Sequence, residues 1–191
     1  RSTKQNHSYA PLTDSDSFSY EPNPDGSVSL KNVWQWNHIP DNSLWSVTDN
    51  PGALRVTTKE TCTNVVMAKN MLTQRMMGPV SDITVQIDAS KINEGDFAGI
   101  CALQGCYGWI AVTKRDGQYS IVMTEKELDP DEGIWGPEGG DKSPGTEQAS
   151  VSVTDTSVEL RIVADFTDGI DEVRFFYKNE TVRKEMDRAL E

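Results

Sequence analysis

The chain has 191 residues, 30 acidic and 18 basic, and a formal net charge of −12. This length suits one domain with a substantial core, and no run approaches the roughly 18 apolar residues of a membrane span. The negative charge disfavours nucleic acid and anionic lipid, because phosphate binding needs patches of Lys and Arg. We therefore expect a neutral ligand, and neither a nucleic acid nor a membrane as partner.

Three cysteines, Cys62, Cys101 and Cys106, allow at most one disulfide within the chain. Cys101 and Cys106 flank a turn and can face each other across a hairpin; buried small thiols are the alternative. The start shows neither Met nor a secretory signal, as in a processed product or an excised domain. The sequence does not decide the cellular compartment of the protein, although a secreted or periplasmic location is favoured.

In chain order, residues 1–27 are rich in Ser, Asp, Asn and Pro without periodicity, which predicts a linker or an arm wrapped on a domain. Residues 28–180 alternate apolar and polar residues between turn signals, which predicts an all-β fold, a two-sheet antiparallel β-sandwich. The predicted strands are 44–49, 53–58, 71–77, 82–88, 97–104, 107–114, 118–126, 149–155, 157–166 and 172–179. Residues 181–191 are a tail of helix formers, predicted to be helical, whose last two residues resemble a cloning remnant.

The three-tryptophan stretch "VWQWNHIPDNSLW" begins at residue 33 and holds most of the five tryptophans of the chain. Trp34 and Trp36 share a face if the segment is extended. These rings either fill the sandwich core or form a platform for the C–H face of a sugar, with the turn supplying polar groups for its hydroxyls. The candidate ligand-binding residues here are Trp36, Asn37, His38, Asp41 and Asn42.

A second aromatic pair lies in "YGWIAV", where alternation places Tyr107 and Trp109 on one face and Ile110 and Val112 on the other. Since the aliphatic side belongs in the core, we expect the aromatic pair to face outward or into a concave groove. The alternative is that the long loop 128–148 covers them.

A strand arginine follows a glutamine in "LTQR", and apolar residues flank the pair. Arg75 must point to solvent or meet a carboxylate. Gln74 and Arg75 therefore contribute either a structural ion pair or a ligand contact.

Loop 128–148 has 21 residues with three prolines and five glycines, and loops of this length are usually functional or disordered. Its Trp135 is a candidate ligand contact. Asp129, Asp131 and Glu132 offer the hard oxygen ligands that Ca²⁺ prefers, although no EF-hand spacing is present. No other cofactor is expected.

Acidic residues also alternate just before this loop, at Glu125 and Glu127. Jelly-roll glycanases place catalytic carboxylates at alternate strand positions, which makes a stand-alone glycosidase an alternative. However, Pro130 interrupts the run and no aromatic residue lines it, so a solvated acidic edge is the simpler interpretation.

Three blocks carry a family resemblance: "VWQWNHIPDNSLWSVTDNPGALRVTT", "AKNMLTQRMMGP" and "EGDFAGICALQGCYGWIAVTKRDGQYSIVM". In order and spacing they resemble the C-terminal β-sandwich of glycoside hydrolase family 43 β-xylosidases and α-L-arabinofuranosidases. "VELRIVADFTDGIDEVRFFYKN" resembles the strand pair that follows. The family continues for several more strands, whereas this chain stops soon afterwards.

The resemblance implies a concanavalin A-like jelly roll, attached in the family to a propeller that holds the catalytic carboxylates. No propeller sequence is present, so no catalytic residue carries over to this chain. We expect a non-catalytic carbohydrate-binding or accessory module of a hemicellulose-degrading hydrolase, with a β-1,4-linked plant-cell-wall polysaccharide such as xylan or arabinoxylan as ligand. The alternative is a structural domain without sugar affinity that docks on a family 43 propeller and completes its active site.

Overall fold

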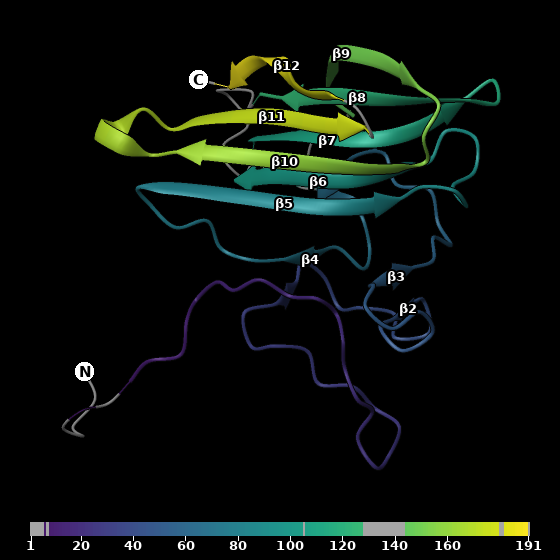
Figure 1. The fold of residues 1–191 in the computed structure, drawn as a ribbon, viewed down its shortest axis with the longest axis vertical. Coiled ribbons are helices and arrows are strands. Elements are labelled where there is room, and N and C mark those ends of the chain that lie inside the picture. Colours follow the sequence, from purple (N-terminus) through teal and green to yellow (C-terminus); the bar gives the residue numbers. More distant parts are fainter. Residues whose placement is uncertain (1–5, 7, 105, 128–143, 180–181, 191) are drawn as a thin grey trace, which may run out of the picture. The chain divides into compact units, whose positions relative to one another are not determined.

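The computed structural model describes residues 6, 8–104, 106–127, 144–179 and 182–190 (Figure 1). The chain divides into two compact units, unit 1 up to Met76 and unit 2 from Met77 onward. In the described part of the chain, no helix is long and apolar enough to cross a membrane.

Unit 2 contains two four-stranded antiparallel sheets, which Figure 1 shows as two layers. The first sheet has the order β12-β11-β10-β5, and the second has the order β6-β7-β8-β9. The eight strands of the two sheets are β5 (Val80–Asp88), β6 (Phe97–Gln104), β7 (Cys106–Arg115), β8 (Gln118–Lys126), β9 (Thr146–Val153), β10 (Ser157–Asp165), β11 (Glu172–Asn179) and β12 (Val182–Leu190). The predicted all-β sandwich is confirmed.

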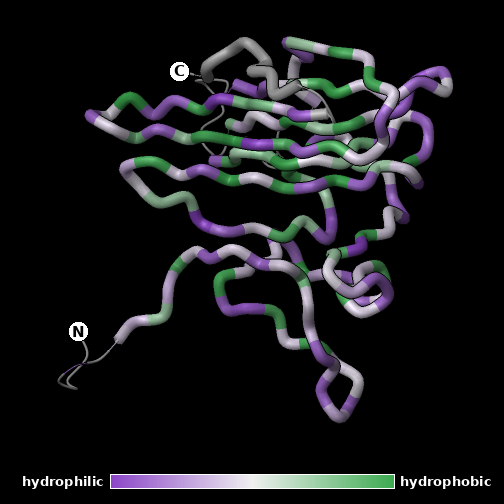
Figure 2. Tube along the Cα trace, viewed as in Figure 1, coloured by the Kyte–Doolittle hydropathy of each residue, from purple (hydrophilic) through white to green (hydrophobic). Residues whose placement is uncertain are grey.

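Alternating residues build the core of unit 2. Leu160 and Ile162 of β10 are 0% and 1% exposed, and Phe175 of β11, which pairs with Ile162, is 0% exposed. The second sheet contributes Ile110 and Ile121, both 0% exposed, and β6 and β7 contact β10 and β11 across the sandwich. Figure 2 shows the same alternation of hydrophilic and hydrophobic residues along the long strands. Because successive strand side chains point to opposite faces, this pattern requires two packed sheets.

The predicted C-terminal helix is wrong, because residues 182–190 form strand β12. This strand pairs antiparallel with β11, with Phe175 opposite Met186 and Val173 opposite Leu190. Val182, Met186 and Leu190 are four residues apart, and a spacing of four keeps apolar residues on one face in a helix and in a strand alike. The open edge of β11 then favours the strand over the local helix propensity.

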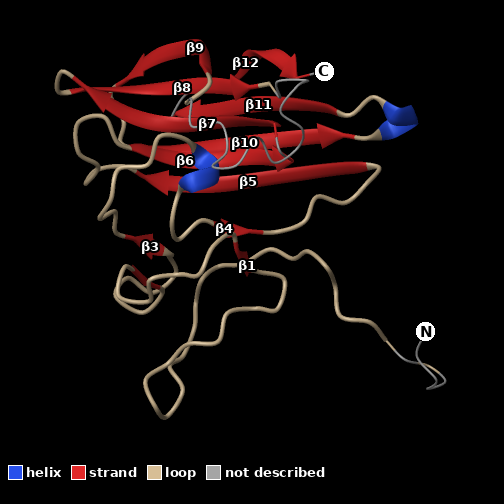
Figure 3. Ribbon diagram, turned by 180° about the vertical axis from the view of Figure 1, so that it is seen from behind, coloured by secondary structure: helices blue, strands red, loops and turns tan. Residues whose placement is uncertain are grey.

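Unit 1 has very little regular structure. Its strands have two residues each, and they form the pairs β1 (Gln35–Trp36) with β4 (Leu72–Thr73) and β2 (Trp45–Ser46) with β3 (Arg55–Val56). The 3-10 helices η1 (Val65–Met67) in unit 1 and η2 (Thr167–Gly169) in unit 2 are the helical turns of the described residues (Figure 3). The three strands predicted within residues 44–77 therefore shrink to short bridges.

Candidate functional site

The turn between β1 and β2, residues 37–43, is fixed by hydrogen bonds from its own side chains and from the side chain of Asn70. His38 Nε2 lies 2.6 Å from the carbonyl oxygen of Val66, and Asn37 Nδ2 donates to the same oxygen at 3.3 Å. Asn70 Oδ1 accepts from the Asp41 N–H at 2.9 Å, and Asn70 Nδ2 donates to the Asp41 carbonyl at 3.1 Å. The turn is thus braced against residues 66–70 by side-chain amides and an imidazole.

Asp41 supports the turn from within. Its Oδ1 accepts from the N–H of Ser43 at 3.0 Å and from the Ser43 hydroxyl at 2.6 Å. The Ser43 hydrogen bonds lower the pKa of Asp41, so this carboxylate is ionised at neutral pH.

An aliphatic side chain stands at the tip of this turn. Ile39 is 92% exposed, the highest value among the large apolar residues that the structure describes as exposed. Single exposed apolar side chains are common, but this one lies on a turn whose neighbouring polar groups are already hydrogen-bonded within the chain. An Ile between His38 and Pro40 in an otherwise polar turn is visible in the sequence, but the predicted site residues are the polar and aromatic ones.

The tryptophans of this stretch take different neighbours. Trp34 stacks on Phe18 with ring centroids 5.5 Å apart, whereas Trp36 packs against Trp45 at 5.1 Å. Asn42 Oδ1 accepts from Trp45 Nε1 at 2.9 Å. All three indoles are half-buried. Each ring therefore packs partly against the chain and is partly accessible at the surface.

Beside Trp45 lies a small hollow of about 50 Å³, whose rim is mostly polar. It is lined by Ser43, Leu44, Trp45, Ser46, Asp49, Arg55 and Thr57. This hollow is too small to enclose a sugar ring, so a sugar here would lie on the surface.

Gln74 has a structural partner. Its Oε1 accepts from the Asp14 N–H at 3.0 Å and its Nε2 donates to the Asp14 carbonyl at 2.9 Å. Arg75 is exposed, and it makes no ion pair with another described residue. Of the two predicted roles, the structural ion pair is not found, and a ligand contact by Arg75 stays a prediction.

On β7 the predicted alternation is correct, but the predicted exposure of Tyr107 is wrong. Ile110 and Val112 are 0% exposed on the core side, whereas Tyr107, on the opposite side, is 4% exposed. The Tyr107 hydroxyl donates to the Pro144 carbonyl at 3.3 Å. Both faces of β7 are therefore covered, and the Pro144 end of loop 128–148 takes part in that cover.

Trp109 is half-buried and does not pair with Tyr107 in a platform. It packs edge-on against Phe97 of the neighbouring strand, with ring centroids 5.1 Å apart. Phe97 is 49% exposed, and the Arg115 guanidinium lies 5.9 Å from its ring centre and 2.7 Å from Glu147 Oε2. Sequence reasoning missed Phe97, although the alternation in "FAGIC" places it on the same face as Gly99.

The acidic run before the loop is only partly solvated. Glu125 is 9% exposed, and its Oε1 accepts from Gln148 Nε2 at 3.0 Å, so a solvated edge is the wrong description of this residue. Glu127 is exposed beyond the end of β8. An open hollow of about 440 Å³ is lined by Glu125, Lys126, Glu127, Gly145 and Thr146.

The remaining predicted site residues, Asp129, Asp131, Glu132 and Trp135, lie outside the described residues. In the part of the chain that is described, no three His, Cys, Asp or Glu side chains gather as a metal site would need. Cys62, Cys101 and Cys106 form no disulfide among the described residues, and on the hairpin Cys101 lies opposite Trp109 and Cys106 opposite Gln104. Burial raises the pKa of the Cys101 thiol to about 11.

Two packed four-stranded antiparallel sheets make unit 2 a β-sandwich. Residues 26–189 match the family described as the β-xylosidase C-terminal concanavalin A-like domain. The chain belongs to this family.

Relatives and solved structures agree with this assignment. The chain is 29% identical over 148 residues to a β-xylosidase of Formosa agariphila, a match that covers 64% of this chain and 24% of that protein. A solved bifunctional GH43-CE protein of Bacteroides eggerthii has a TM-score of 0.76 and 35% identity, covering 92% of this chain and 20% of that one. A GH43 glycoside hydrolase engineered to display endo-xylanase and exo-arabinofuranosidase activity has a TM-score of 0.78 and 26% identity, covering 98% and 35%. The chain thus spans about a quarter of the length of the Formosa relative.

Proposed function

We propose that this chain is the non-catalytic accessory domain of a family 43 glycoside hydrolase that acts on xylan-type substrates. In this proposal the domain docks on the catalytic domain of its enzyme through the turn 37–43. The support from relatives is that proteins named for β-xylosidase and GH43 activities contain this domain as a small part of their length.

The observation that carries the docking role is Ile39, 92% exposed on a turn that is held rigid from below. The side chains of Asn37, His38 and Asp41 form hydrogen bonds within the chain, so they have fewer donors and acceptors available for sugar hydroxyls. An ordered apolar tip loses little conformational entropy on binding, and it gains from transfer into an apolar pocket of a protein.

A titration of the chain against the catalytic domain of its parent enzyme tests this proposal. Replacing Ile39 by Ser removes the apolar tip without changing its braces, and we expect Kd to rise by about 10- to 100-fold. Ile170→Ser is the matched control, because Ile170 is also exposed, at 54%, but follows η2 in unit 2. Equal affinities for wild type and Ile39→Ser would contradict docking through this turn.

Binding of xylan or arabinoxylan is a second candidate function, and the half-buried pair Trp36 and Trp45 favours it. Indole faces pack on the C–H face of pyranose rings, and the small polar hollow beside Trp45 offers nearby hydroxyl and charged groups. Affinity electrophoresis in soluble arabinoxylan separates the two functions. Retardation that Trp36→Ala removes and Ile39→Ser preserves would favour sugar binding, whereas unchanged mobility of the wild type would leave docking as the sole proposal.

A further inference from the structure

The amino-terminal arm is extended and lies against the rest of unit 1 by alternate residues. Asp16, Phe18 and Tyr20 are partly buried, whereas Ser15, Ser17 and Ser19 between them are exposed. This period of two shows that one face of the segment is covered, although the backbone of Phe18 itself departs from the extended conformation. The family match begins at residue 26, so residues 14–20 of the arm lie outside it, whereas the residues that they contact lie inside it.

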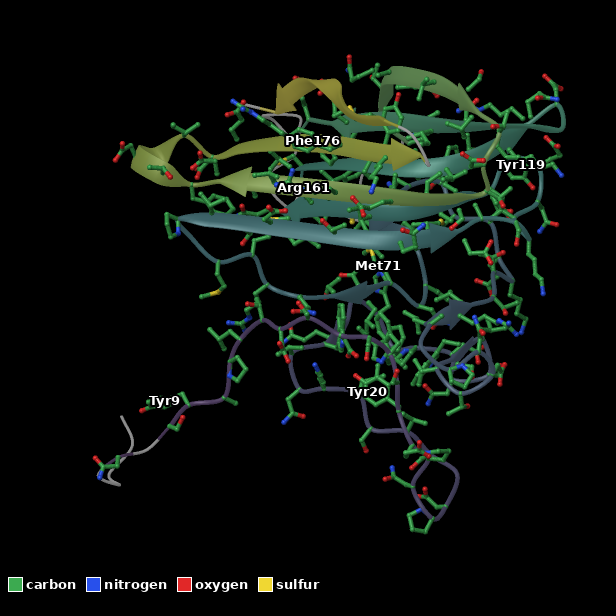
Figure 4. The ribbon with its side chains drawn as sticks, viewed as in Figure 1. Tyr9, Tyr20, Met71, Tyr119, Arg161 and Phe176 are labelled. Atoms are coloured by element: carbon green, nitrogen blue, oxygen red, sulfur yellow. The ribbon has the colours of Figure 1, made fainter. Side chains whose placement is uncertain are left out.

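The carboxylate of Asp16 is the hub of this contact. Its Oδ1 accepts from the Phe18 N–H at 2.8 Å, and its Oδ2 accepts from Trp34 Nε1 at 2.7 Å and from the Tyr20 hydroxyl. The same Tyr20 oxygen accepts from the Lys31 N–H at 3.1 Å. Figure 4 shows Tyr20 within unit 1, pointing into the surrounding side chains. Hydrogen bonds to an ionised carboxylate are stronger than neutral ones, so one side chain joins the arm to residues 31 and 34.

Phe18 adds a backbone observation to this hub. Its φ is +52°, in the left-handed region that bulky residues rarely adopt. Its ring stacks on Trp34, and its carbonyl accepts from the Gly52 N–H at 3.3 Å. A residue stays in this region when its surroundings over-determine its position, which is what the ring stack and two backbone hydrogen bonds do here.

A second fastening lies just upstream. The Gln74 amide pairs with both backbone groups of Asp14, which imitates one rung of a β-ladder. Lys31 Nζ donates to Asp14 Oδ2 at 2.8 Å and to the Ser15 carbonyl at 2.5 Å. The arm is therefore held both at residues 14–15 and at residues 16–20, and Lys31 takes part in both fastenings.

We propose that residues 14–20 form a clasp that fastens the arm to unit 1 and fixes where the chain upstream of residue 14 leaves the unit. A linker with this composition would otherwise be flexible, and the clasp converts it into a rigid exit. This inference does not depend on the docking proposal, because it concerns only contacts within unit 1. A failed titration with a catalytic domain would leave it standing.

Limited digestion of the whole chain with chymotrypsin tests the clasp, because the enzyme cleaves after Phe and Tyr and needs a locally opened segment. The bond after Tyr9 is the internal reference, since Tyr9 is 69% exposed and lies upstream of the clasp. Each rate is divided by that of the same bond in a free peptide of residues 8–24. In the wild type we expect the bonds after Phe18 and Tyr20 to be cleaved at least about tenfold more slowly than the reference bond.

Two variants and a control complete the test. Asp16→Ala removes the hub, and we expect cleavage after Phe18 to accelerate about tenfold, with the rate after Tyr9 unchanged. Gln74→Ala leaves the arm sequence intact, and it tests the clasp if Asp16→Ala fails to fold. We expect it to accelerate cleavage after Phe18 by less than Asp16→Ala does. Asp25→Ala is the control, because among the described residues the Asp25 carboxylate accepts hydrogen bonds from Ser27, in a local turn downstream of the clasp. Equal corrected rates at all three bonds in the wild type, or no acceleration in either variant, would overturn the clasp.

Discussion

Units 1 and 2 are stabilised by different kinds of hydrogen bond. In unit 2, strands of eight to ten residues form continuous backbone ladders over a core of fully buried side chains. In unit 1, strands of two residues leave most of the backbone to be tied by side chains such as Asp16, Asp41, Asn70 and Gln74. Backbone ladders tolerate most side-chain changes on the open face, whereas a side-chain brace is lost with one substitution. We therefore expect the positions most sensitive to mutation to be apolar in unit 2, and in unit 1 to include polar braces besides the buried Val47.

The largest expected effect lies in the core of unit 2, where Phe175 and Phe176 are adjacent on opposite faces of β11. Phe175 is 0% exposed, whereas Phe176 is half-buried beneath the Arg161 guanidinium, 5.2 Å from its ring centre (Figure 4). We expect Phe175→Ala to lower the free energy of unfolding by about 3–5 kcal/mol and Phe176→Ala by about 1 kcal/mol. Denaturant unfolding measures both, and equal losses would contradict the assignment of faces.

The next effect is at a polar brace of unit 1. Asn70 is 6% exposed, has a φ of +55°, and makes both hydrogen bonds to the Asp41 backbone. We expect Asn70→Ala to cost about 1–3 kcal/mol of local stability, because it loses these bonds and strains the left-handed backbone. Asn70→Gly also loses the hydrogen bonds but avoids the backbone strain, so its local stability should lie between those of Asn70→Ala and the wild type. Hydrogen exchange of the Asp41 amide is the measurement, and full protection in Asn70→Ala would break the comparison.

Acid should open unit 1 at its carboxylate braces. Burial opposes ionisation of Asp16, but hydrogen bonds from Tyr20, Trp34 and the Phe18 N–H outweigh it and lower its pKa below the usual 3.8. A lowered folded pKa means that the stabilisation is present above about pH 3.8 and is lost as the pH falls through the folded value. Asp14 and Lys31 are the other charged groups that face this site.

We therefore expect the Phe18 and Ser43 amides to lose protection below about pH 4 while the amides of β7 and β8 stay protected. Hydrogen exchange corrected for intrinsic rates measures this. The control is Asp16→Asn, which should remove most of the pH dependence at Phe18. Loss of protection in both units at the same pH would show a single cooperative acid transition instead.

The smallest effect is expected on the outer face of the first sheet. Arg161 forms a two-pronged ion pair with Asp82, but the two side chains are 24% and 50% exposed. Solvent weakens such a pair, so Arg161→Lys should cost less than about 1 kcal/mol in denaturant unfolding. Arg174→Lys is the comparison, at a second ion pair in which Arg174 is 52% and Glu172 17% exposed. A loss as large as that of Phe175→Ala would contradict the solvent exposure of this pair.

The strands of unit 2 could be predicted from the sequence, because a strand with one buried and one open face alternates apolar and polar residues. The ranges 97–104 and 118–126 are reproduced to the residue in β6 and β8. The prediction failed at β12, where a spacing of four fits both helix and strand and only pairing with β11 decides. It also failed at Tyr107, because alternation indicates which face a residue lies on but not whether that face is covered.

Unit 1 was less predictable, since its backbone is shaped by partners distant in sequence. Asp14 and Gln74 are 60 residues apart, and Asp41 and Asn70 are 29 apart, so no local pattern announces either pair. The turn 37–43 was singled out from its composition as a candidate ligand site, and that role stays a prediction. However, its polar side chains are largely structural braces, and the most exposed group is the apolar Ile39.

The central claim is that the tip of turn 37–43 meets a protein surface. Photo-crosslinking from position 39 tests it most directly, with Ile39→p-benzoylphenylalanine in the parent enzyme and the same change at Ile170 as control. We predict crosslinks from position 39 to peptides of the catalytic domain and none from position 170. Crosslinks from position 39 only to added arabinoxylan, or to nothing beyond this chain, would contradict the claim.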